Sequence, residues 1–477
     1  MPARGIDREQ LLARMDTLAE GDADWRAGKT WCLVYSAGEE HGRFVKEAHN
    51  RFFSENALNP FAFKSLRRME SETIAALGGM LHGPESVCGA LTAGGTESIL
   101  LAMATYRERA RKLRPWILRP EVIVPTTAHP AFDKAAHYFG LRLRKVGVDR
   151  DYRVDVRTFR RKINRNTIGA VVSAPHYCQG VVDPVEEVAA VCKRWGVPVH
   201  VDACVGGMML PWVEKLGREV PRWDFRVPGV TSISLDLHKY GYAAKGASAV
   251  MYRSMDVLKH QFFVTTDWPG GIYVSANVLG TRPGGPVAAA WAAVFSLGEE
   301  GYLELTRKGL EVRDRVMDGV ASIDGIEVFG RPHGTLVSVG SSDDLALPIF
   351  AVADQLSERG WHFDRHQNPN CIHLTCGVSN LDAVDAFLVD LREATEHVRA
   401  HPELGKEGQA ATYGMMAKIP LRGMVKQSVL QVMEHLYAPG VDEPDMDEAT
   451  KSDPRVEKLA GMVVDAVDAV NRFRGRT

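Results

Sequence analysis

The sequence predicts an α/β fold built on a mostly parallel β-sheet, and two observations carry this prediction. Short runs of β-branched residues alternate with helical patterns from about residue 85 to residue 255. These runs are apolar on both faces, which is typical of parallel strands that helices cover on both sides. Ligands of such sheets bind at the carboxyl ends of the strands, so we expect the functional side chains there.

The elements of this region follow one another in a regular order. Strands are expected at residues 122–124, 168–172, 197–201 and 232–235, and helices at residues 132–139 and 185–195. The segment before about residue 85 has a mostly helical and polar pattern instead. We therefore predict an N-terminal helical segment over residues 1–85 and a large domain over residues 86–300.

The pattern changes after about residue 300. A long helix is expected over residues 302–320, and short strands are expected at residues 325–329, 336–339 and 372–375. The stretch 280–286, which is rich in proline and glycine, separates the two regions. We predict a smaller α+β domain over residues 301–477.

Composition and cysteine usage exclude several classes of protein. The 477 residues carry a net charge of -2 and are 45% hydrophobic and 25% charged, so no global attraction for nucleic acid or anionic lipid is expected. The basic run Arg107 to Arg114 is interpreted as a solvated helix end, with a lipid-surface contact as the alternative. The seven cysteines form no C-x-x-C pair, so neither a metal site nor a disulfide framework is predicted. With a charged N-terminus and no long apolar stretch, the chain is predicted to be cytoplasmic, without a membrane-spanning segment.

A pair of glycines stands directly before a helical run. In Gly94-Gly95-Thr96-Glu97 the glycines let the backbone approach a ligand, and Thr96 can cap the helix. Exposed N–H groups and the helix dipole then favour an anion such as a phosphate. The alternative is a plain turn followed by a helix cap.

Three further side chains follow predicted strands. Asp202 ends the strand at 197–201, on the same side as His200, where a protonated pyridine nitrogen would justify a partly buried carboxylate. Lys239 follows the strand at 232–235, a suitable place for a desolvated lysine that forms a Schiff base, and the adjacent His238 can donate to a phosphate. His129 follows the strand at 122–124 and can lie flat against an aromatic cofactor. The alternatives are a turn-starting aspartate, a solvated lysine and a loop histidine.

Several longer stretches carry a resemblance to a known family. They are Gly94 to Leu100, Ala128-His129 with Phe132, His200 to Cys204, His238 to Tyr242 with Lys245-Gly246, Thr266-Asp267-Trp268, and Arg282 to Gly285. From about Tyr35 to Tyr437 the chain resembles the sphingosine-1-phosphate lyases. These are a branch of the group II decarboxylase superfamily, which depends on pyridoxal 5′-phosphate (PLP) and has the type I aminotransferase fold.

The resemblance implies a role for each candidate residue. Lys239 would hold PLP as a Schiff base, His129 would stack on its ring, and Asp202 would pair with the ring nitrogen. The other cofactor-binding residues would be Gly95, Thr96, His200, Ala203, His238 and, from a second subunit, Thr281. Tyr35 and Lys245 match positions that recognise the substrate phosphate, with Asn59 as a further substrate-binding candidate. The family forms obligate dimers with shared active sites, to which residues 1–85 would contribute. Its eukaryotic members carry a membrane anchor that we do not expect here.

The implied reaction is a retro-aldol cleavage of a phosphorylated long-chain base into a fatty aldehyde and phosphoethanolamine. The nearest alternative is a PLP-dependent amino-acid decarboxylase, and a more distant one is a binding protein without turnover. One position departs from the family, because Asn59 stands in Asn56-Ala57-Leu58-Asn59 where these lyases usually have histidine. An amide cannot shuttle a proton, so we expect a slower enzyme, another proton carrier or a smaller substrate. The alternative is that Asn59 keeps an orienting hydrogen bond and little changes.

Overall fold

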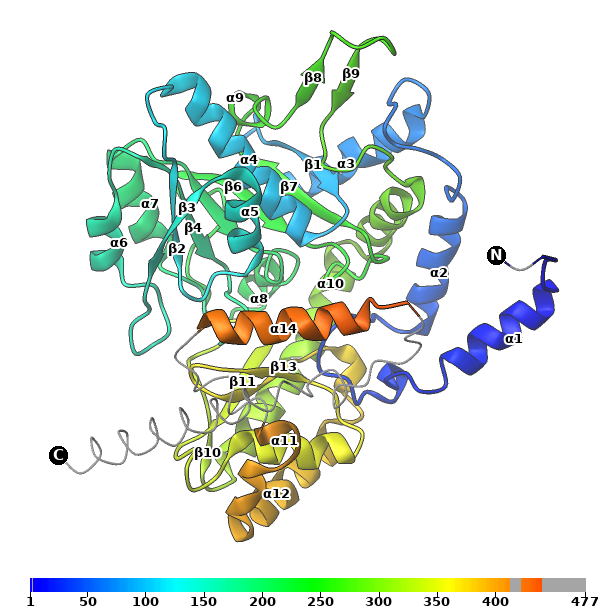
Figure 1. Ribbon diagram of the computed structural model, residues 1–477, viewed down its shortest axis with the longest axis vertical. Helices are drawn as coiled ribbons and strands as arrows, with labels where there is room; N and C mark the ends of the chain where they lie inside the picture. Colours follow the sequence, from blue (N-terminus) through cyan, green and yellow to red (C-terminus); the bar gives the residue numbers. More distant parts are fainter. Residues whose placement is uncertain (2, 412–421, 440–477) are drawn as a thin grey trace.

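The computed structural model describes residues 1, 3–411 and 422–439 and contains a large and a small β-sheet with helices around them (Figure 1). The large sheet has seven strands in the order β1-β7-β6-β5-β4-β2-β3. The strands are β1 (Cys88–Thr92), β2 (Glu121–Pro125), β3 (Arg142–Val146), β4 (Thr167–Ser173), β5 (Val199–Asp202), β6 (Val230–Leu235) and β7 (Ser248–Tyr252). Strands β2 to β6 pair in parallel, whereas β7 runs antiparallel to both β6 and β1. The predicted mostly parallel sheet is confirmed.

Helices cover both faces of this sheet because its central strands are apolar on both sides. Val122 and Val124 belong to the hydrophobic core that also contains α4 side chains, whereas Ile123 belongs to the core on the opposite face. The helices of this domain are α4 (Gly95–Leu113), α5 (Ala131–Phe139), α6 (Val156–Lys162), α7 (Val185–Arg194), α8 (Leu210–Lys215) and α9 (Met255–Leu258). The sheet is thus a rigid support for side chains at its carboxyl edge.

The small sheet is antiparallel and has the order β10-β11-β13-β12. Its strands are β10 (Ile326–Val328), β11 (Leu336–Ser341), β12 (Asp364–His366) and β13 (Cys371–Thr375), and its helices are α11 (Ile349–Glu358) and α12 (Val384–Ala400). The N-terminal segment completes this core, because Trp31 is fully buried there with its ring 4.8 Å from that of Phe387.

A long helix, α10 (Gly284–Ala321), connects the two sheets and is interrupted at Gly298, whose φ of 55° is favourable only for glycine. The proline- and glycine-rich stretch 280–286 includes the first residues of this helix. The N-terminal helices are α1 (Arg8–Leu18), α2 (Glu39–Asn50) and α3 (Lys64–Met80), and the short 3-10 helices are Trp25–Ala27, Val378–Asn380 and Pro402–Lys406.

Two elements complete the described chain. The hairpin of β8 (Phe263–Thr265) and β9 (Tyr273–Ser275) projects from the top of the molecule, and α14 (Arg422–Leu436) crosses the front (Figure 1). Among the helices of the described residues, none is both long and apolar enough to cross a bilayer.

Candidate active site

A cavity of about 510 Å³ opens at the carboxyl edge of the large sheet, beside the small sheet. Eight of the candidate residues line it: Tyr35, Gly95, Thr96, His129, Asp202, His238, Lys239 and Lys245. Four others, His200, Ala203, Asn59 and Thr281, lie outside its lining. Further lining residues that sequence reasoning did not select include Tyr177, Cys204, Asp236 and Asp364.

Lys239 lies in the turn after β6, with Asp236 as its ionic partner. The Lys239 Nζ is 3.0 Å from Asp236 Oδ2, and the Ser248 hydroxyl donates to Asp236 Oδ1 at 2.7 Å. Burial is the largest single influence and lowers the pKa of Lys239, but the charge and hydrogen bond of Asp236 together with Tyr35 and Cys204 outweigh it, so the pKa is raised overall. The free amine is therefore held protonated.

The glycine pair makes a close approach that only glycine permits. Helix α4 begins at Gly95, and a Cβ on Gly95 would come within 2.8 Å of the Asp236 carboxylate oxygens and the Cys204 Sγ. The first N–H groups of a helix lack intrahelical partners and attract anions. Since Gly95 and Thr96 both line the cavity, this helix end can hold a phosphate beside Lys239.

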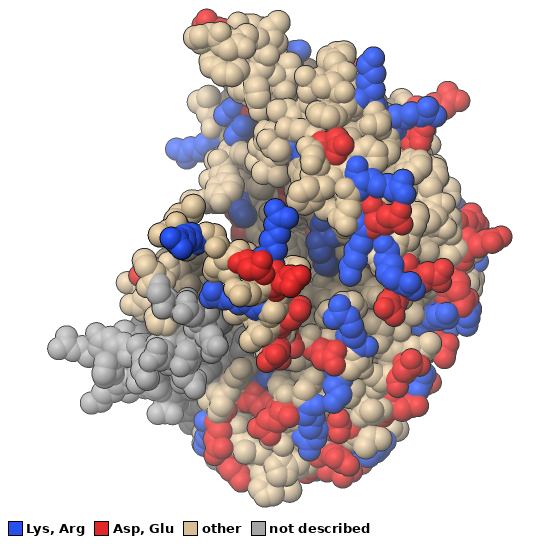
Figure 2. Space-filling view, turned by 90° about the vertical axis from the view of Figure 1, so that its right-hand side faces the viewer, with Lys and Arg blue, Asp and Glu red and all other residues tan. Residues whose placement is uncertain are grey.

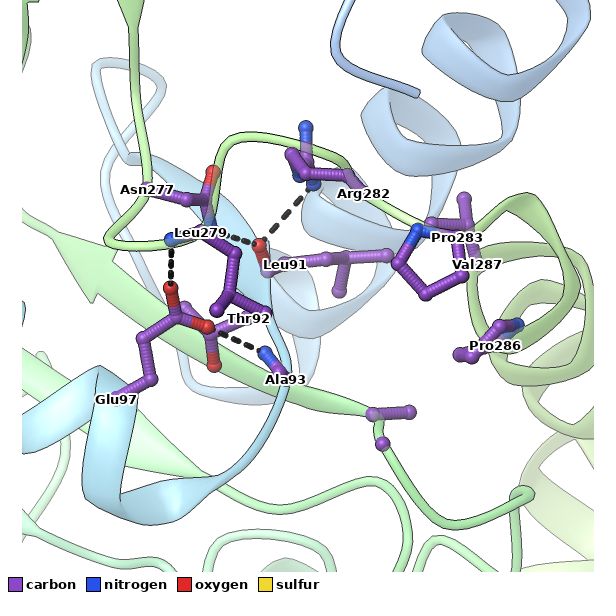
Figure 3. A pocket seen from close by; sticks show the side chains of 12 residues that line it. Leu91, Thr92, Ala93, Glu97, Asn277, Leu279, Arg282, Pro283, Pro286 and Val287 are labelled. Carbon is purple, nitrogen blue, oxygen red and sulfur yellow. Dashed lines mark hydrogen bonds between the residues drawn. The ribbon is translucent and has the colours of Figure 1, made fainter. Parts of the chain in front are cut away.

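Side chains from other elements fix the backbone behind this turn (Figure 3). Glu97 Oε2 accepts a hydrogen bond from the Ala93 N–H at 2.6 Å. The Leu91 carbonyl accepts from Asn277 Nδ2 at 2.8 Å and from the Arg282 guanidinium at 3.1 Å. The segment around residues 277–282 is thereby tied to the end of β1 and to the turn that follows it.

The same segment carries Thr281. Its ends are held by Glu97, whose Oε1 accepts from the Val278 N–H at 2.9 Å, and by a 2.7 Å ion pair of Arg282 with Glu70. Thr281 itself is exposed and does not line the cavity of its own chain. Glu70 and Arg282 support the site from behind, a role for which their sequence spacing gives no signal.

Asp202 lies at the end of β5 and faces the cavity. Its Oδ1 accepts hydrogen bonds from the Cys204 N–H at 3.1 Å and from the Ser234 hydroxyl at 3.4 Å. Because both contacts engage Oδ1, Oδ2 can face a cation in the cavity.

The two neighbours of Asp202 lie outside the cavity. His200 is fully buried between the hydroxyls of Ser232 and Ser234, at 2.9 and 3.2 Å, and burial lowers its pKa to about 4. His200 is on the same face of β5 as Asp202 but lies two residues further from the carboxyl end of the strand. It therefore contacts Ser234 rather than a ligand in the cavity. Ala203 is also buried, and Cys204 and Val205 line the cavity instead.

His129 and His238 share the same hydrogen-bond arrangement at Nδ1, and the Nε2 of His238 lies 3.7 Å from Asp236 Oδ2. The Nδ1 of His129 accepts from the Ala131 N–H at 3.1 Å, and the Nδ1 of His238 accepts from the Ala247 N–H at 3.2 Å. With Nδ1 acting as acceptor, each ring carries its proton on Nε2. Both side chains can therefore donate from Nε2 to a ligand.

Two lining residues near the Lys239 turn are the candidates for recognising a substrate phosphate. The Lys245 Nζ donates to the Leu33 carbonyl at 2.7 Å and lies 5.2 Å from the centre of the Tyr35 ring. Partial loss of hydration and the charge of Lys239 lower the pKa of Lys245. Burial raises the pKa of Tyr35 to about 12, so its phenol remains neutral. A cation and a hydroxyl donor thus stand together.

Asn59 lies in the turn that leads into α3. Its Oδ1 accepts from the N–H groups of Phe61 and Ala62 at 3.0 and 3.2 Å. The side chain is exposed and outside the cavity of its own chain. Within one chain, Asn59 therefore shapes a turn, and a role at a site would require a second subunit.

Comparisons with known proteins agree with this arrangement. Residues 55–339 match the pyridoxal-dependent decarboxylase conserved domain. The chain is 44% identical to the sphingosine-1-phosphate lyase of Arabidopsis thaliana over 445 residues, which cover 92% of this chain and 81% of that protein. It is 38% identical to sphingosine-1-phosphate lyase 1 of Rattus norvegicus over 441 residues, 92% of this chain and 77% of that one. The solved structure of a Burkholderia pseudomallei sphingosine-1-phosphate lyase superposes with a TM-score of 0.81 at 40% identity, covering 84% of this chain and 93% of that one.

Proposed function

This chain belongs to the sphingosine-1-phosphate lyase family of PLP-dependent enzymes, and we propose that it cleaves a phosphorylated long-chain base into a fatty aldehyde and phosphoethanolamine. One observation on the cavity supports this reaction independently of the family assignment. The cavity that Lys239 lines is also lined by Lys245 and Tyr35. A single ligand in this cavity can therefore contact the Lys239 amine together with a cation and a hydroxyl group that suit a phosphate.

The residues present fit PLP. Lys239 supplies an amine for its aldehyde, and the end of α4 supplies N–H groups for its phosphate, in a cradle that a Cβ on Gly95 would fill. Asp202 supplies a carboxylate for its ring nitrogen, and we propose that His129 stacks on the ring. When bound, PLP accepts the electron pair of the bond that breaks.

The chain's own side chains then have defined tasks. Lys245 and Tyr35 would bind and orient the substrate phosphate, which places the amino group towards Lys239. The 3-hydroxyl loses its proton, the C2–C3 bond breaks, and one proton returns to C2, so the atoms of the substrate are shared between aldehyde and phosphoethanolamine. Whenever its amine is free, Lys239 could hold a proton at Nζ because Asp236 favours its charged form.

We further propose that the working form is a homodimer. Thr281 is exposed on a segment that the chain holds firmly, which suits a residue that completes the partner's phosphate site. In the β8–β9 hairpin, Ile272 is 73% exposed and Trp268 is 54% exposed. Large exposed apolar side chains that lie close together are typical of a protein–protein interface. In Figure 2 charges of both signs are mixed over the face shown, whereas the projecting top of the molecule is mostly uncharged.

A cytoplasmic location is proposed on the basis of the cysteines. All seven lie in the described residues and are free thiols, and five of them are buried. Such usage fits a reducing compartment.

Product analysis tests the reaction. PLP-loaded protein incubated with sphingosine-1-phosphate should release fatty aldehyde and phosphoethanolamine in equal amounts, and should release no CO2 from L-aspartate or L-glutamate. Release of CO2 without aldehyde would assign the chain to the decarboxylases. Absence of all products with full PLP content would favour a binding protein.

A further inference from the structure

Three potential metal ligands gather on one face of the small sheet, at the edge of the active-site cavity. Asp364 on β12 lies directly opposite His373 on β13, and His366 follows Asp364 by two residues, so all three side chains point to the same side. Their donor atoms all lie within 4.8 Å of one another. The register of β12 and β13 therefore brings the three ligands together. The cysteine pattern of the sequence could not predict this cluster, because the cluster contains no cysteine.

The two histidines lack the partners that buried imidazoles normally have. His373 is fully buried, and within the described part of the chain neither of its ring nitrogens forms a hydrogen bond. The Nδ1 of His366 is likewise buried without a partner among the described residues. The backbone of Tyr177 lies near His373 and that of Cys178 lies near His366, but neither contact has hydrogen-bonding geometry. The rings are stacked with centres 4.5 Å apart, which satisfies none of these nitrogens. Buried polar atoms of this kind call for an additional ligand.

We propose that Asp364, His366 and His373 bind a divalent transition-metal ion of the zinc class. Two imidazoles and one carboxylate are a donor set that zinc uses, with metal–ligand distances of about 2.0–2.2 Å. Two ligand atoms on one ion are then at most about 4 Å apart. The cluster needs to contract only slightly, and the side chains of Asp364 and His366 are half-buried rather than fully enclosed.

The surroundings complete such a site. Tyr177 donates to Asp364 Oδ2 at 2.6 Å, and its ring centre lies 4.2 Å from that of His373. A hydrogen bond of this kind orients a ligating carboxylate. Asp364 and Tyr177 also line the cavity, so the ion would lie in its wall. It would link the small sheet to the loop after β4.

Metal content of the PLP-loaded, untagged protein tests this inference. After chelator treatment and dialysis against zinc chloride, we expect about one zinc per chain by elemental mass spectrometry. His366→Asn and Asp364→Asn should each lower the retained zinc by about tenfold or more while PLP content stays unchanged. His362→Asn, an exposed histidine just before the cluster, is the matched control and should retain the ion. Less than about a tenth of an equivalent in the unmodified protein, or full zinc retention in both cluster variants, would overturn the inference.

A second measurement needs no variant and so remains decisive if the substitutions disturb folding. Crystals of the unmodified protein soaked in zinc chloride should give an anomalous peak at the zinc edge between Asp364, His366 and His373. A peak only elsewhere, or none, would contradict the proposal.

Discussion

At the scale of single residues, the site depends on how Asp236 controls Lys239. The two side chains are separated by one turn and are joined by a 3.0 Å ion pair in a largely buried setting. A lysine must be neutral to attack the cofactor aldehyde, yet this pair favours the charged form. Capture of the cofactor by the apoprotein should therefore depend on pH.

The first prediction concerns that pH dependence. Asp236→Asn keeps a side chain that can accept from Ser248 but removes the charge that raises the pKa of Lys239. The pKa of the free lysine should fall, so the midpoint for PLP capture should move to lower pH by about one unit or more, with about tenfold faster capture at neutral pH. Stopped-flow absorbance of the apoprotein mixed with PLP measures this. An unchanged midpoint would show that Asp236 does not control the amine.

The second prediction concerns the substrate phosphate. Lys245→Ala should raise KM for a phosphorylated substrate by roughly 10–100-fold with a small change in kcat, because it removes a charge-assisted contact made in the ground state. Lys259→Ala is the control, since Lys259 pairs with Asp256 far from the cavity lining and should leave KM unchanged. Equal KM values in the two variants would place the phosphate elsewhere.

Local sequence pattern could identify part of the site. Lys239, Asp202 and Gly95 each stand next to a strand or helix end, where chemistry is expected. His200 was predicted to bind the cofactor, but it does not line the cavity. The alternation of side chains shows which face of the sheet a residue is on, but not how far it lies from the carboxyl end of the strand. Tyr177 and Asp364 come from segments 187 residues apart, so no local pattern could join them.

At the scale of elements, hydrophobic runs predicted most of the buried strands of the large sheet but missed the polar or interrupted ones, and they also missed the buried and apolar strand β7. Strands β2, β4, β5 and β6 were predicted from their β-branched residues, and nearly all of their residues are buried. Strand β3, with the sequence RLRKV, and β12, with DRH, are largely polar and lie at sheet edges. Strand β1 is interrupted by Gly89, where a Cβ would come within 2.5 Å of the Val250 carbonyl oxygen. These strands are specified by their partners rather than by their own pattern.

The turn before α3 yields the third prediction. If the dimer brings this turn to the partner's cavity, Asn59→His restores a proton carrier and should raise kcat on sphingosine-1-phosphate roughly tenfold. Asn59→Ala is the matched control, because it removes the same turn contacts without adding an imidazole and should cost about 1 kcal/mol of stability. Steady-state kinetics at equal PLP content compares them. An equal or lower kcat for the histidine variant would remove the case for a missing proton shuttle.

At the scale of the whole molecule, distant segments share cores in a way that domain boundaries read from sequence could not capture. Trp31 belongs to the core of the small sheet, although residues 1–85 were predicted as a segment of their own. Helix α10 enters both regions, although a boundary was predicted at residue 300. The local sequence pattern predicts helices and strands well. The hydrophobic core that each of them joins depends on contacts between residues that are far apart in the sequence.

The fourth prediction tests the proposed dimer. Ile272→Glu places a charge on the exposed β8–β9 hairpin and should shift the protein towards monomer, with loss of activity if the sites are shared. Leu345→Glu changes a side chain of similar exposure on the small domain, 77% against 73%, and should leave the mass unchanged. Sedimentation velocity at several protein concentrations gives the masses. A dimer that survives Ile272→Glu would locate the interface elsewhere, and a monomeric unmodified protein would contradict the dimer itself.

The most direct test of the account is to find where the cofactor is attached. Purified protein loaded with PLP should absorb at about 410–430 nm, as expected for a protonated Schiff base. Borohydride reduces the C=N bond to a stable amine, so peptide mass spectrometry of the reduced protein locates the link. We predict the phosphopyridoxyl group on Lys239 and on no other lysine near the cavity, and loss of both the absorption band and turnover in Lys239→Ala. Modification of Lys245 instead, or an active Lys239→Ala protein that keeps the band, would contradict the account.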